Sequence, residues 1–555
     1  MEIISIAIVA STMVATWASF LVSLIYKDFY VWPAVVGFIA VFILIIKTVK
    51  IKSSVPSLLY PVTIIGWSIY LIKLFSQMLV VKSDGIWAGG SNVWGDWAGH
   101  IGYISNWLYG ANWPPQNPWY SGIRLAYPFL FDFTSAILAK LGLSLSWSLQ
   151  LPGIIFGVIL IVLLFKLSER ITKSAAASAV AVAIFMLSGG LGFMYMNNKN
   201  LEATHNYEAN IQLVNFVISE MVPQRGILLG ITAALSIFIL IDSGYFLLAG
   251  LIAGMIPFFH AHTYLVVMAV SGMYFLYKPH RKWFLFFIPS ILLAIPQYSY
   301  FSIQTSNFIK LQLGWAAHVQ KDNWLWFWFK NIGLLLPLLP IAWITSYFKD
   351  RRLFWLYLPF LIIFIACNIW IFQPWENDNT KFLRFWYLAS AILAGWFLVR
   401  IPKAIAMIIL ASLLLSGGID AGSWLNFEKN KLQMWSRADM LSAETIKVRT
   451  PRESIFLTKD NHNHWVVDLA GRKIVMGFRG WLWSWGINYG QRERDVNAMF
   501  AGDASLFPKY HINYVILEAN QEDYYLDRFP SFTVANGQKV FDVRVNTLPT
   551  ARFGN

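Results

Sequence analysis

Long apolar stretches alternate with short polar ones from the N-terminus to about residue 423. Each stretch holds roughly 20 mostly apolar residues, the length that a helix needs to cross a ~30 Å hydrocarbon core. The pattern predicts thirteen membrane-spanning helices. The expected spans are 3–25, 31–49, 57–80, 150–167, 174–195, 226–242, 244–258, 260–277, 283–301, 326–347, 353–372, 383–399 and 403–420.

Basic residues in the short loops orient these spans. Because Lys and Arg concentrate in cytoplasmic loops, five basic loops on one side predict a cytoplasmic N-terminus and, with an odd number of spans, an extracytoplasmic C-terminus. Merging 244–277 into one span would move the last basic loops to the opposite side, so two spans are favoured there. The five loops hold Lys47, Lys50 and Lys52; Lys166, Arg170 and Lys173; Lys278, Arg281 and Lys282; Lys349, Arg351 and Arg352; and Arg400 and Lys403.

The last part of the chain, from about 424 to 555, is too polar to span a membrane. The runs SIFLT (454–458) and YVILEA (514–519) indicate strands, and RERDVNAMFAG (492–502) indicates a helix. We therefore expect a membrane module over 1–423, with a first external loop at 82–149 that holds interfacial helices, and a small external α/β or mixed domain over 424–555. Three tryptophans spaced by two would form one aromatic face if their segment were a strand; they are Trp481, Trp483 and Trp485.

Composition agrees with a polytopic membrane protein. The chain is 57% hydrophobic and 13% charged, whereas a soluble protein of 555 residues needs more charge to cover its surface. The net charge of +14 lies in short loops, which indicates topology and anionic lipids rather than nucleic acid. The N-terminal run lacks a basic start and a cleavage site, which predicts a retained span. The single cysteine, Cys367, excludes disulfides within the chain.

One acidic residue stands out in the first external loop. The stretch SNVWGDWAGHIGYISNWLYG (91–110) contains a single carboxylate, Asp96. If a helix runs from Asp96, the spacing i, i+4, i+7 places Asp96, His100 and Tyr103 on one face. A neighbouring apolar face predicts a short amphipathic helix on the membrane surface; its residues are Trp97, Ile101, Ile104 and Leu108.

Two explanations of Asp96 are open. A carboxylate at the mouth of an intramembrane cavity is a functional candidate. Alternatively, Asp96 is only the N-cap of this helix, since Asp is favoured at that position. Gly99 occupies the third following position, so a capping box is excluded.

The arrangement resembles the GT-C superfamily of membrane glycosyltransferases, which includes protein O-mannosyltransferases and aminoarabinose transferases. The resemblance covers about 80–420 and rests on the long first external loop, an Asp just after an early span, the odd number of spans and the external C-terminal domain. Its motif is Gly95–His100, supported by GIRLAYPFLFDF (122–133) and PFFHAHTY (257–264). It is nearest to uncharacterised prokaryotic members with DWAxH-type and FHAH-type motifs.

The resemblance implies an all-α polytopic membrane protein, in the inner membrane if the source is prokaryotic. It implies sugar transfer from a polyprenyl-phosphate donor to a glycan, lipid or protein acceptor on the outer face. Asp96 takes the role of the superfamily's loop Asp, which is the catalytic base or lies beside the metal and acceptor. This chain reads Gly-Asp-Trp and lacks an adjacent second acid, which disfavours a metal at this loop.

Direct displacement of the donor phosphate inverts the anomeric carbon and needs cations beside the departing phosphate. Arg225 stands at the outer start of one span, and Lys381 and Arg384 lie i, i+3 at the outer start of another. Arg124, beside Tyr127 in the first loop, is a candidate for contact with the acceptor or the donor. The alternative for these cations is contact with lipid headgroups.

Two histidines flank an expected turn at the outer ends of two spans. His260 and His262 would point about 200° apart on a continuous helix, but Pro257 allows a break that brings both imidazoles together. Metal binding, phosphate contact and proton transfer are open, as is a purely structural histidine. Glu376 and Asp378 are candidates for the same cavity or for a divalent cation. Alternatively, Asp378, Asn379 and Thr380 supply N-cap chemistry for the following span.

Some functions are disfavoured by missing motifs. The sequence has no GxxxxGK[ST] loop, no HExxH and no GxSxG, which argues against ATP-driven transport, a zincin-type protease and a serine hydrolase. A proton-coupled lipid or solute transporter and a non-catalytic binding protein remain alternatives. Transport predicts charges in mid-span, whereas this sequence concentrates polar residues at the outer ends of spans, so the sequence favours the glycosyltransferase.

Overall fold

The computed structural model describes residues 1–51, 57–196, 202–301, 309–518 and 525–544; Lys52 of the first basic loop lies outside them. The chain divides into two compact units, each described here by itself. The helices α1 (Glu2–Tyr26) and α6 (Leu145–Thr172) contribute residues to both. Unit 1 comprises Met1–Ala15, Ala34–Gln77 and Gln150–Asn430, and unit 2 comprises Thr16–Pro33, Met78–Leu149 and Lys431–Asn555.

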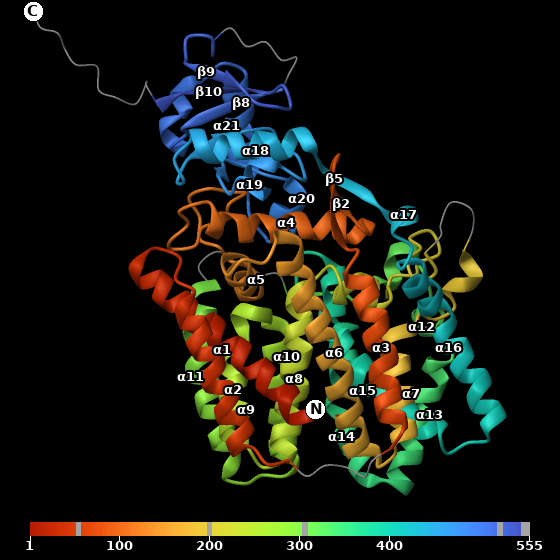
Figure 1. Cartoon of the computed structure of the whole chain (residues 1–555). Coiled ribbons are helices and arrows are strands. Elements are labelled where there is room, and N and C mark those ends of the chain that lie inside the picture. The colour runs from red at the N-terminus through yellow and green to blue at the C-terminus, as the bar shows by residue number, and fades with distance from the viewer. Residues whose placement is uncertain (52–56, 197–201, 302–308, 519–524, 545–555) are drawn as a thin grey trace, which may run out of the picture. The chain divides into compact units, whose positions relative to one another are not determined.

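Unit 1 is a bundle of helices (Figure 1), and every stretch that the hydrophobic pattern marks as a span contains a helix. Besides α1 and α6 these are α2 (Trp32–Thr48), α3 (Leu59–Phe75), α7 (Ala175–Leu187), α8 (Arg225–Asp242), α9 (Phe246–Met255), α10 (Pro257–Tyr277), α11 (Lys282–Phe301), α12 (Trp324–Ile332), α13 (Leu335–Lys349), α14 (Arg351–Cys367), α15 (Thr380–Leu398) and α16 (Lys403–Ser423). Shorter elements are η1 (Gly192–Tyr195), η2 (Val217–Met221), η3 (Trp315–Gln320), η4 (Glu376–Asn379), β3 (Lys310–Leu311), β4 (Trp370–Ile371) and α17 (Phe427–Asn430).

The number of full-length spans is smaller than expected. Among the described residues, seven helices are long and apolar enough to cross a membrane, or eight if α12 and α13 count as one. These two meet at 92°, so a continuous span over 326–347 is wrong. Gly333 ends α12 with a φ of 58°, which favours glycine and breaks the helix. The predicted number of thirteen spans is therefore not confirmed. Apolar composition alone does not reveal where a helix bends or how short it is, as in α9.

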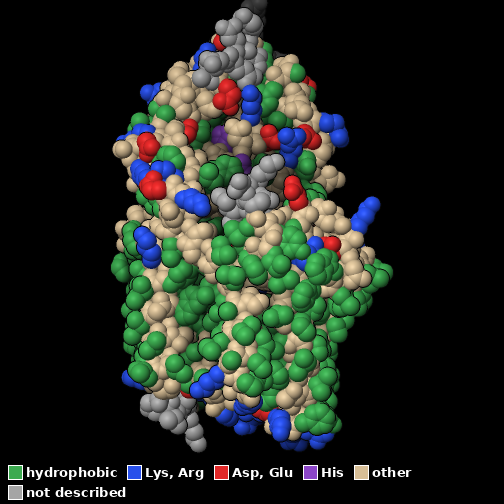
Figure 2. All heavy atoms as spheres, turned by 90° about the vertical axis from the view of Figure 1, so that its right-hand side faces the viewer, with side chains coloured by type: hydrophobic (Ala, Val, Ile, Leu, Met, Phe, Trp, Pro, Cys, Tyr) green, Lys and Arg blue, Asp and Glu red, His purple; other side chains and the backbone are tan. Residues whose placement is uncertain are grey.

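All five basic loops lie at one end of unit 1. The hydroxyl of Tyr245 accepts a hydrogen bond from the Lys50 backbone N–H at 2.7 Å, and Asp242 pairs with both Arg170 and Arg352. Figure 2 shows Lys and Arg side chains gathered at the lower end of the hydrophobic helical body. The remaining two loops lie at the same end. Lys278 of one loop lines a cavity together with Arg170 and Arg352, and Arg400 of the other interacts electrostatically with Asp350.

At the opposite end of unit 1, buried polar side chains hold the loop that precedes α8. Asp420 near the end of α16 and Asn331 in α12 accept hydrogen bonds from backbone N–H groups of this loop. Buried backbone N–H groups need such acceptors. The bonds run from Ala203 N and Thr204 N to Asp420 at 2.6 and 2.7 Å, and from Gln212 N and Leu213 N to Asn331 at 2.8 Å each.

Unit 2 contains two sheets. A three-stranded antiparallel sheet has the order β1 (Leu79–Lys82), β2 (Gly85–Ala88), β5 (Leu432–Ser436). A five-stranded mixed sheet has the order β7 (Lys473–Ile474), β6 (Ile455–Leu457), β8 (Tyr514–Leu517), β10 (Lys539–Asp542), β9 (Ser531–Thr533). In this sheet β6 runs parallel to β7 and β8, and β10 runs antiparallel to β8 and β9. Leu457, Val515 and Phe541 face its buried core.

The strands and the helix expected in the C-terminal part are present, since β6 lies in SIFLT, β8 in YVILEA, and α21 (Gly490–Phe500) in the predicted helical stretch. The three tryptophans do not form the single aromatic face that a strand would give, because α20 (Arg479–Ser484) is helical there. Trp481 and Trp485 therefore lie one turn apart with stacked rings 6.0 Å apart, while Trp483 is exposed. The other elements are α4 (Ser91–Leu108), α5 (Leu130–Lys140), α18 (Arg437–Arg449), α19 (Trp465–Asp468), η5 (Ala504–Leu506) and η6 (Pro508–Tyr510).

The first long loop and the C-terminal residues belong to the same compact unit. The Ser105 hydroxyl of α4 donates to the Asp468 backbone carbonyl at 2.7 Å, and the Asn106 amide donates to the Gly471 carbonyl at 2.9 Å. Gly471 has a φ of 65°, and a Cβ there would lie 2.2 Å from the Ser105 carbonyl oxygen. This close approach requires glycine, so α4 and α19 pack backbone to backbone.

Candidate functional site

Helix α4 carries the acidic residue of the first loop, and it begins earlier than the apolar pattern indicates. Its N-cap is Gly90 and its first residue is Ser91, so Asp96 lies inside the helix and the N-cap explanation is wrong. The first turn is held because Val93 is fully buried and the Trp94 indole donates to a backbone carbonyl of β5 at 3.0 Å. Asp96 is thus a partly buried carboxylate on a continuous helix.

The surroundings of α4 differ from a surface helix. All residues from Trp97 to Trp107 are buried, because α5 packs on one side and α19 on another. A short helix that lies on the membrane surface does not describe this burial, because Ser105 and Asn106 also make bonds to the C-terminal part of unit 2. The helical spacing that groups Asp96 with the next two polar residues on its face is present.

One turn after Asp96, His100 forms a buried hydrogen-bonded pair that the sequence pattern does not indicate. His100 Nδ1 lies 2.8 Å from Asp132 Oδ2 in α5, and both side chains are less than one-tenth exposed. When Nδ1 carries the proton and donates to this carboxylate, Nε2 is left as an acceptor. Asp132 is the last residue but one of the stretch GIRLAYPFLFDF (122–133), so this acid stood in a quoted motif, but nothing in the sequence paired it with His100.

Aromatic rings surround Tyr103 on the same helix face. Its ring stacks with that of Tyr127 at 5.6 Å and meets Trp119 edge-on at 4.9 Å, and the ring of Trp485 is 6.3 Å away. The Tyr103 hydroxyl is buried with no hydrogen-bond partner among the described residues, and burial raises its pKa. An aromatic cluster with a buried hydroxyl suits contact with a sugar or another amphipathic ligand.

Arg124 lies in the same loop but is exposed. Its backbone forms an isolated antiparallel bridge with Gln116, which fixes the loop rather than the guanidinium. Arg124 remains a predicted contact for a substrate.

A second carboxylate in unit 2 was not singled out from the sequence. Asp468 ends α19 and is fully buried, and neither carboxylate oxygen has a hydrogen bond of normal geometry among the described residues. The nearest donor is the Trp119 indole beside it. Burial raises the pKa of Asp468 well above its usual value, which favours the neutral acid.

In unit 1 the two histidines lie together, as the sequence predicts. His260 has non-helical backbone angles inside α10, three residues after Pro257, and this kink brings the His260 and His262 rings to 5.2 Å. His260 Nδ1 lies 2.7 Å from the Thr263 hydroxyl, and His262 Nε2 contacts the Gln373 amide. Both imidazoles interact electrostatically with Lys381, so they belong to one polar cluster.

The start of α15 adds charged groups to this cluster. Lys381 pairs with Asp378 at 2.9 Å, and both side chains are mostly buried. Asp378 lies in η4, two residues before α15, and Asn379 is the N-cap, without a side-chain capping bond. Of the three residues with N-cap chemistry, Asn379 and not Asp378 occupies the N-cap position. Glu376 instead turns toward His318, with 3.3 Å between Oε2 and Nε2.

The two arginines of the predicted phosphate site are both buried. Arg384 forms an ion pair with Glu220 and donates to the Ser219 hydroxyl at 3.1 Å and to the Val214 carbonyl. Its guanidinium is therefore already matched by a carboxylate from the π-helical turn η2. Arg225 is the first residue of α8 and is 3% exposed. Lys381 is the most accessible of the three cations.

The histidine cluster does not fit a metal ion. Among the residues that the structure describes, no three His, Cys, Asp or Glu side chains lie close enough together to hold one. His260 Nδ1 and His262 Nε2 are occupied by Thr263 and Gln373. A zinc site needs at least three protein ligands. The role of metal ligands suggested for these histidines is therefore not supported.

The residues predicted from the sequence fall into two groups. Asp96, His100, Tyr103, Arg124 and Tyr127 belong to unit 2, together with Asp132. The remainder belong to unit 1 and are Arg225, His260, His262, Glu376, Asp378, Lys381 and Arg384.

No protein-family model and no curated protein matches this chain. Among solved structures, the chain is similar to ArnT from Cupriavidus metallidurans bound to undecaprenyl phosphate, at a TM-score of 0.47 and 12% identity, over 87% of this chain and 97% of that one. The same protein in the apo state gives a TM-score of 0.46 and 11% identity over the same shares. The function proposed below rests on this chain's own residues.

Proposed function

We propose that the chain is an integral-membrane glycosyltransferase that moves a sugar from a polyprenyl-phosphate donor to an acceptor on the extracytoplasmic face, with a cytoplasmic N-terminus. The observation that carries the proposal is the face of α4. It holds a partly buried carboxylate, Asp96, one turn from the His100–Asp132 pair and two turns from the aromatic cluster around Tyr103.

In the proposed reaction, an acceptor hydroxyl or amine attacks the anomeric carbon of the donor. The bond from this carbon to the phosphate oxygen breaks, and polyprenyl phosphate leaves with the bonding electron pair. Asp96 takes the acceptor proton, since a carboxylate within hydrogen-bond reach is a competent general base. Attack opposite the leaving group inverts the anomeric configuration.

His100 and the aromatic cluster serve the sugar or the acceptor. With Nδ1 donating to Asp132, Nε2 of His100 is held as an acceptor for a hydroxyl. Tyr103 and Tyr127 offer ring faces and hydroxyl groups at the same place, which suits the apolar and polar faces of a sugar ring.

The departing phosphate needs positive charge, and we assign it to Arg225, Lys381 and Arg384. Lys381 contributes most directly, because the ion pair between Arg384 and Glu220 must break before Arg384 can bind a phosphate. His260 and His262 would donate hydrogen bonds or move a proton in this cluster. No step is assigned to a metal.

The test is release of polyprenyl phosphate by the purified protein from a panel of polyprenyl-phosphate-linked sugars. Asp96→Asn should lower the rate about 10²- to 10⁴-fold, the usual contribution of a general base. Asp84→Asn, in the exposed turn between β1 and β2, is the matched control and should keep the wild-type rate. Retained turnover in Asp96→Asn would remove Asp96 as base. A wild-type protein that releases nothing from any donor would end the glycosyltransferase proposal.

A further inference from the structure

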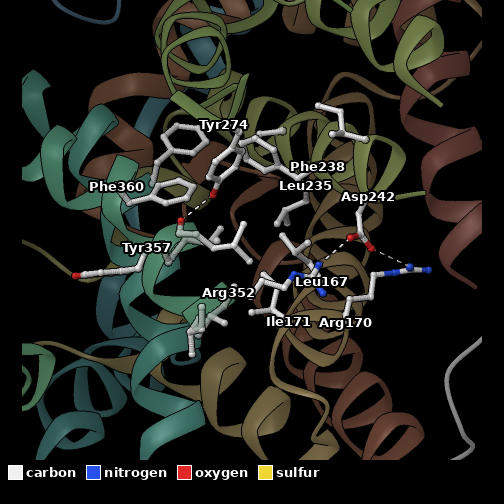
Figure 3. A pocket seen from close by; sticks show the side chains of 18 of the residues that line it. Leu167, Arg170, Ile171, Leu235, Phe238, Asp242, Tyr274, Arg352, Tyr357 and Phe360 are labelled. Atoms are coloured by element: carbon white, nitrogen blue, oxygen red, sulfur yellow. Dashed lines mark hydrogen bonds and ion pairs between the residues drawn. The ribbon is translucent and has the colours of Figure 1, made fainter. Parts of the chain in front are cut away.

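A cavity in unit 1 has residues of the basic loops in its lining, among them Arg170 and Arg352 (Figure 3). It has a volume of about 300 Å³ and is lined by residues of α6, α8, α9, α10, α11, α14 and α15. None of the candidate catalytic, phosphate-binding or histidine residues lines it. It is lined instead by residues at the end of unit 1 that holds the basic loops, so it has a separate role.

The mouth of the cavity is an arginine-rich cluster. Asp242 Oδ1 lies 2.9 Å from Arg352 Nη2, and Asp242 Oδ2 lies 3.4 Å from Arg170 Nη1, which Figure 3 shows side by side. Lys278 also lines the cavity, and Arg170 is shared with Glu2. Three permanent cations therefore face two carboxylates. Arg352 is about half exposed, so donors of its guanidinium that Asp242 does not use are open to an anion.

The depth of the cavity matches one leaflet of a bilayer. On α8 the lining runs from Asp242 to Ile231, a separation of eleven helical steps, which at the helical rise corresponds to about 16 Å. The hydrocarbon core of a bilayer is roughly 30 Å thick, so one leaflet has half that depth. An occupant anchored at the basic mouth would thus reach the middle of the membrane.

The inner walls offer hydrocarbon and almost no free polar partner. Leu235, Phe238 and Phe360 surround the space. The two tyrosine hydroxyls nearby are satisfied, since Tyr274 donates to the Leu356 carbonyl at 2.7 Å and the Tyr357 oxygen lies 3.0 Å from the Ser390 hydroxyl. Such walls accept an alkyl chain and reject a sugar, a nucleotide or an inorganic ion.

We propose that this cavity binds an anionic glycerophospholipid of the cytoplasmic leaflet, with one acyl chain between α8 and α14 and the phosphate at Arg352 and Lys278. Charge and shape agree on this occupant: cations stand at headgroup level, and an apolar space one leaflet deep lies behind them. The cytoplasmic leaflet carries the anionic lipids that basic residues attract. A volume near 300 Å³, at the low end for ligand pockets, favours a single acyl chain over a long polyprenyl chain. The proposal does not depend on the glycosyltransferase activity.

The first test measures lipid retention and thermal stability of the full-length protein in a neutral detergent. Phosphatidylglycerol added in mixed micelles should raise the melting temperature and remain bound after detergent exchange, as read by mass spectrometry. Phosphatidylcholine should be retained at least about tenfold less. Glycerol phosphate, the headgroup without a chain, should have no effect. Equal retention of the two lipids, an equal effect of glycerol phosphate, or displacement by a lower concentration of polyprenyl phosphate would each overturn the proposed occupant.

Two substitutions localise the binding. Arg352→Ala should lower phosphatidylglycerol retention about tenfold or more, and it leaves Asp242 paired with Arg170. Its matched control is Arg351→Ala on the same helix, because Arg351 contacts Tyr347 and does not line the cavity. Equal retention in the two variants would overturn the headgroup position.

The apolar part is tested by filling it. Leu235→Trp should abolish retention of phosphatidylglycerol. Ala389→Leu is a smaller enlargement of another lining residue and should weaken retention. It replaces Leu235→Trp as the test if the Leu235→Trp protein does not fold. Leu247→Trp, at an exposed position of α9, is the control. Wild-type retention in a folded Leu235→Trp or Ala389→Leu protein would show that no chain enters the cavity.

Discussion

The imidazole of His100 and the carboxylate of Asp132 lie 2.8 Å apart and are buried together. His100 is four residues after Asp96, the acid that we propose as base. A buried pair of this kind fixes which nitrogen of the histidine carries the proton. It also makes Asp132 a positioning residue, because its effect on the chemistry acts through His100.

Replacement of Asp132 by Asn should disturb His100 without removing Asp96. The loss of a charged hydrogen bond costs about 1.5–3 kcal/mol, so both the melting temperature and the rate of polyprenyl phosphate release should fall. The informative readout is the split between kcat and KM, because loss of the pair should lower kcat in the folded Asp132→Asn protein, whereas the control Asp84→Asn should keep both values. An unchanged kcat in Asp132→Asn would mean that the pair is only structural.

Lys381 should contribute to phosphate binding through its charge. Lys381→Ala is expected to weaken binding of a polyprenyl phosphate about tenfold, while Lys381→Arg should retain most of it, because the charge is kept. Binding is measured by titration of the purified protein. Lys349→Ala, at the end of α13 beside the basic loops, controls for general charge loss. Unchanged binding in Lys381→Ala would remove Lys381 from the phosphate site.

Arg384 and Glu220 should behave as a stabilising pair. Arg384→Met leaves Glu220 buried without its partner and should destabilise the protein by about 3–5 kcal/mol, whereas Glu220→Met combined with Arg384→Met should recover most of that loss. Thermal unfolding in detergent compares the single and double variants. The stable double variant then reports whether Arg384 also binds phosphate. A double variant no more stable than Arg384→Met would contradict the pairing.

Chelation should leave sugar transfer unchanged. The two histidines of α10 already contact Thr263 and Gln373, and no third His, Cys, Asp or Glu among the described residues completes a metal site with them. We therefore expect the same rate of polyprenyl phosphate release before and after treatment with a strong chelator. Loss of activity that Mg²⁺, Mn²⁺ or Zn²⁺ restores would show that this expectation is wrong.

Asp468 should make stability depend on pH. Because burial raises its folded-state pKa above the ordinary value of 3.8, its contribution to stability is fully present below that value and is lost as pH rises toward the folded pKa. The loss is about 1.4 kcal/mol per pH unit within this window. Asp468→Asn has no proton to release, so its melting temperature should fall less than that of wild type between pH 5 and pH 8.

The control for this comparison is Glu444→Gln, since Glu444 is exposed on α18. It should follow the wild-type curve. Parallel curves for wild type and Asp468→Asn would show that the buried carboxyl does not titrate over this range.

Local features were predictable from the sequence. The helices follow the apolar stretches, the five basic loops lie at one end, and Pro257 allowed the kink that brings the two histidines of α10 together. Helical periodicity placed Asp96, His100 and Tyr103 on one face. Each of these features depends on residues a few positions apart, whose relation is set by backbone geometry.

The tertiary structure decided the partners. Asp132 is 32 residues from His100, and Glu220 is 164 residues from Arg384, so no local pattern indicates either pair. The cavity at the basic end likewise needs walls from seven helices. By itself the sequence determined which segments are helical, which end of the bundle is basic and which acid to examine. Only packing decided which charges neutralise one another and where space is left for a lipid, because these depend on contacts between distant segments.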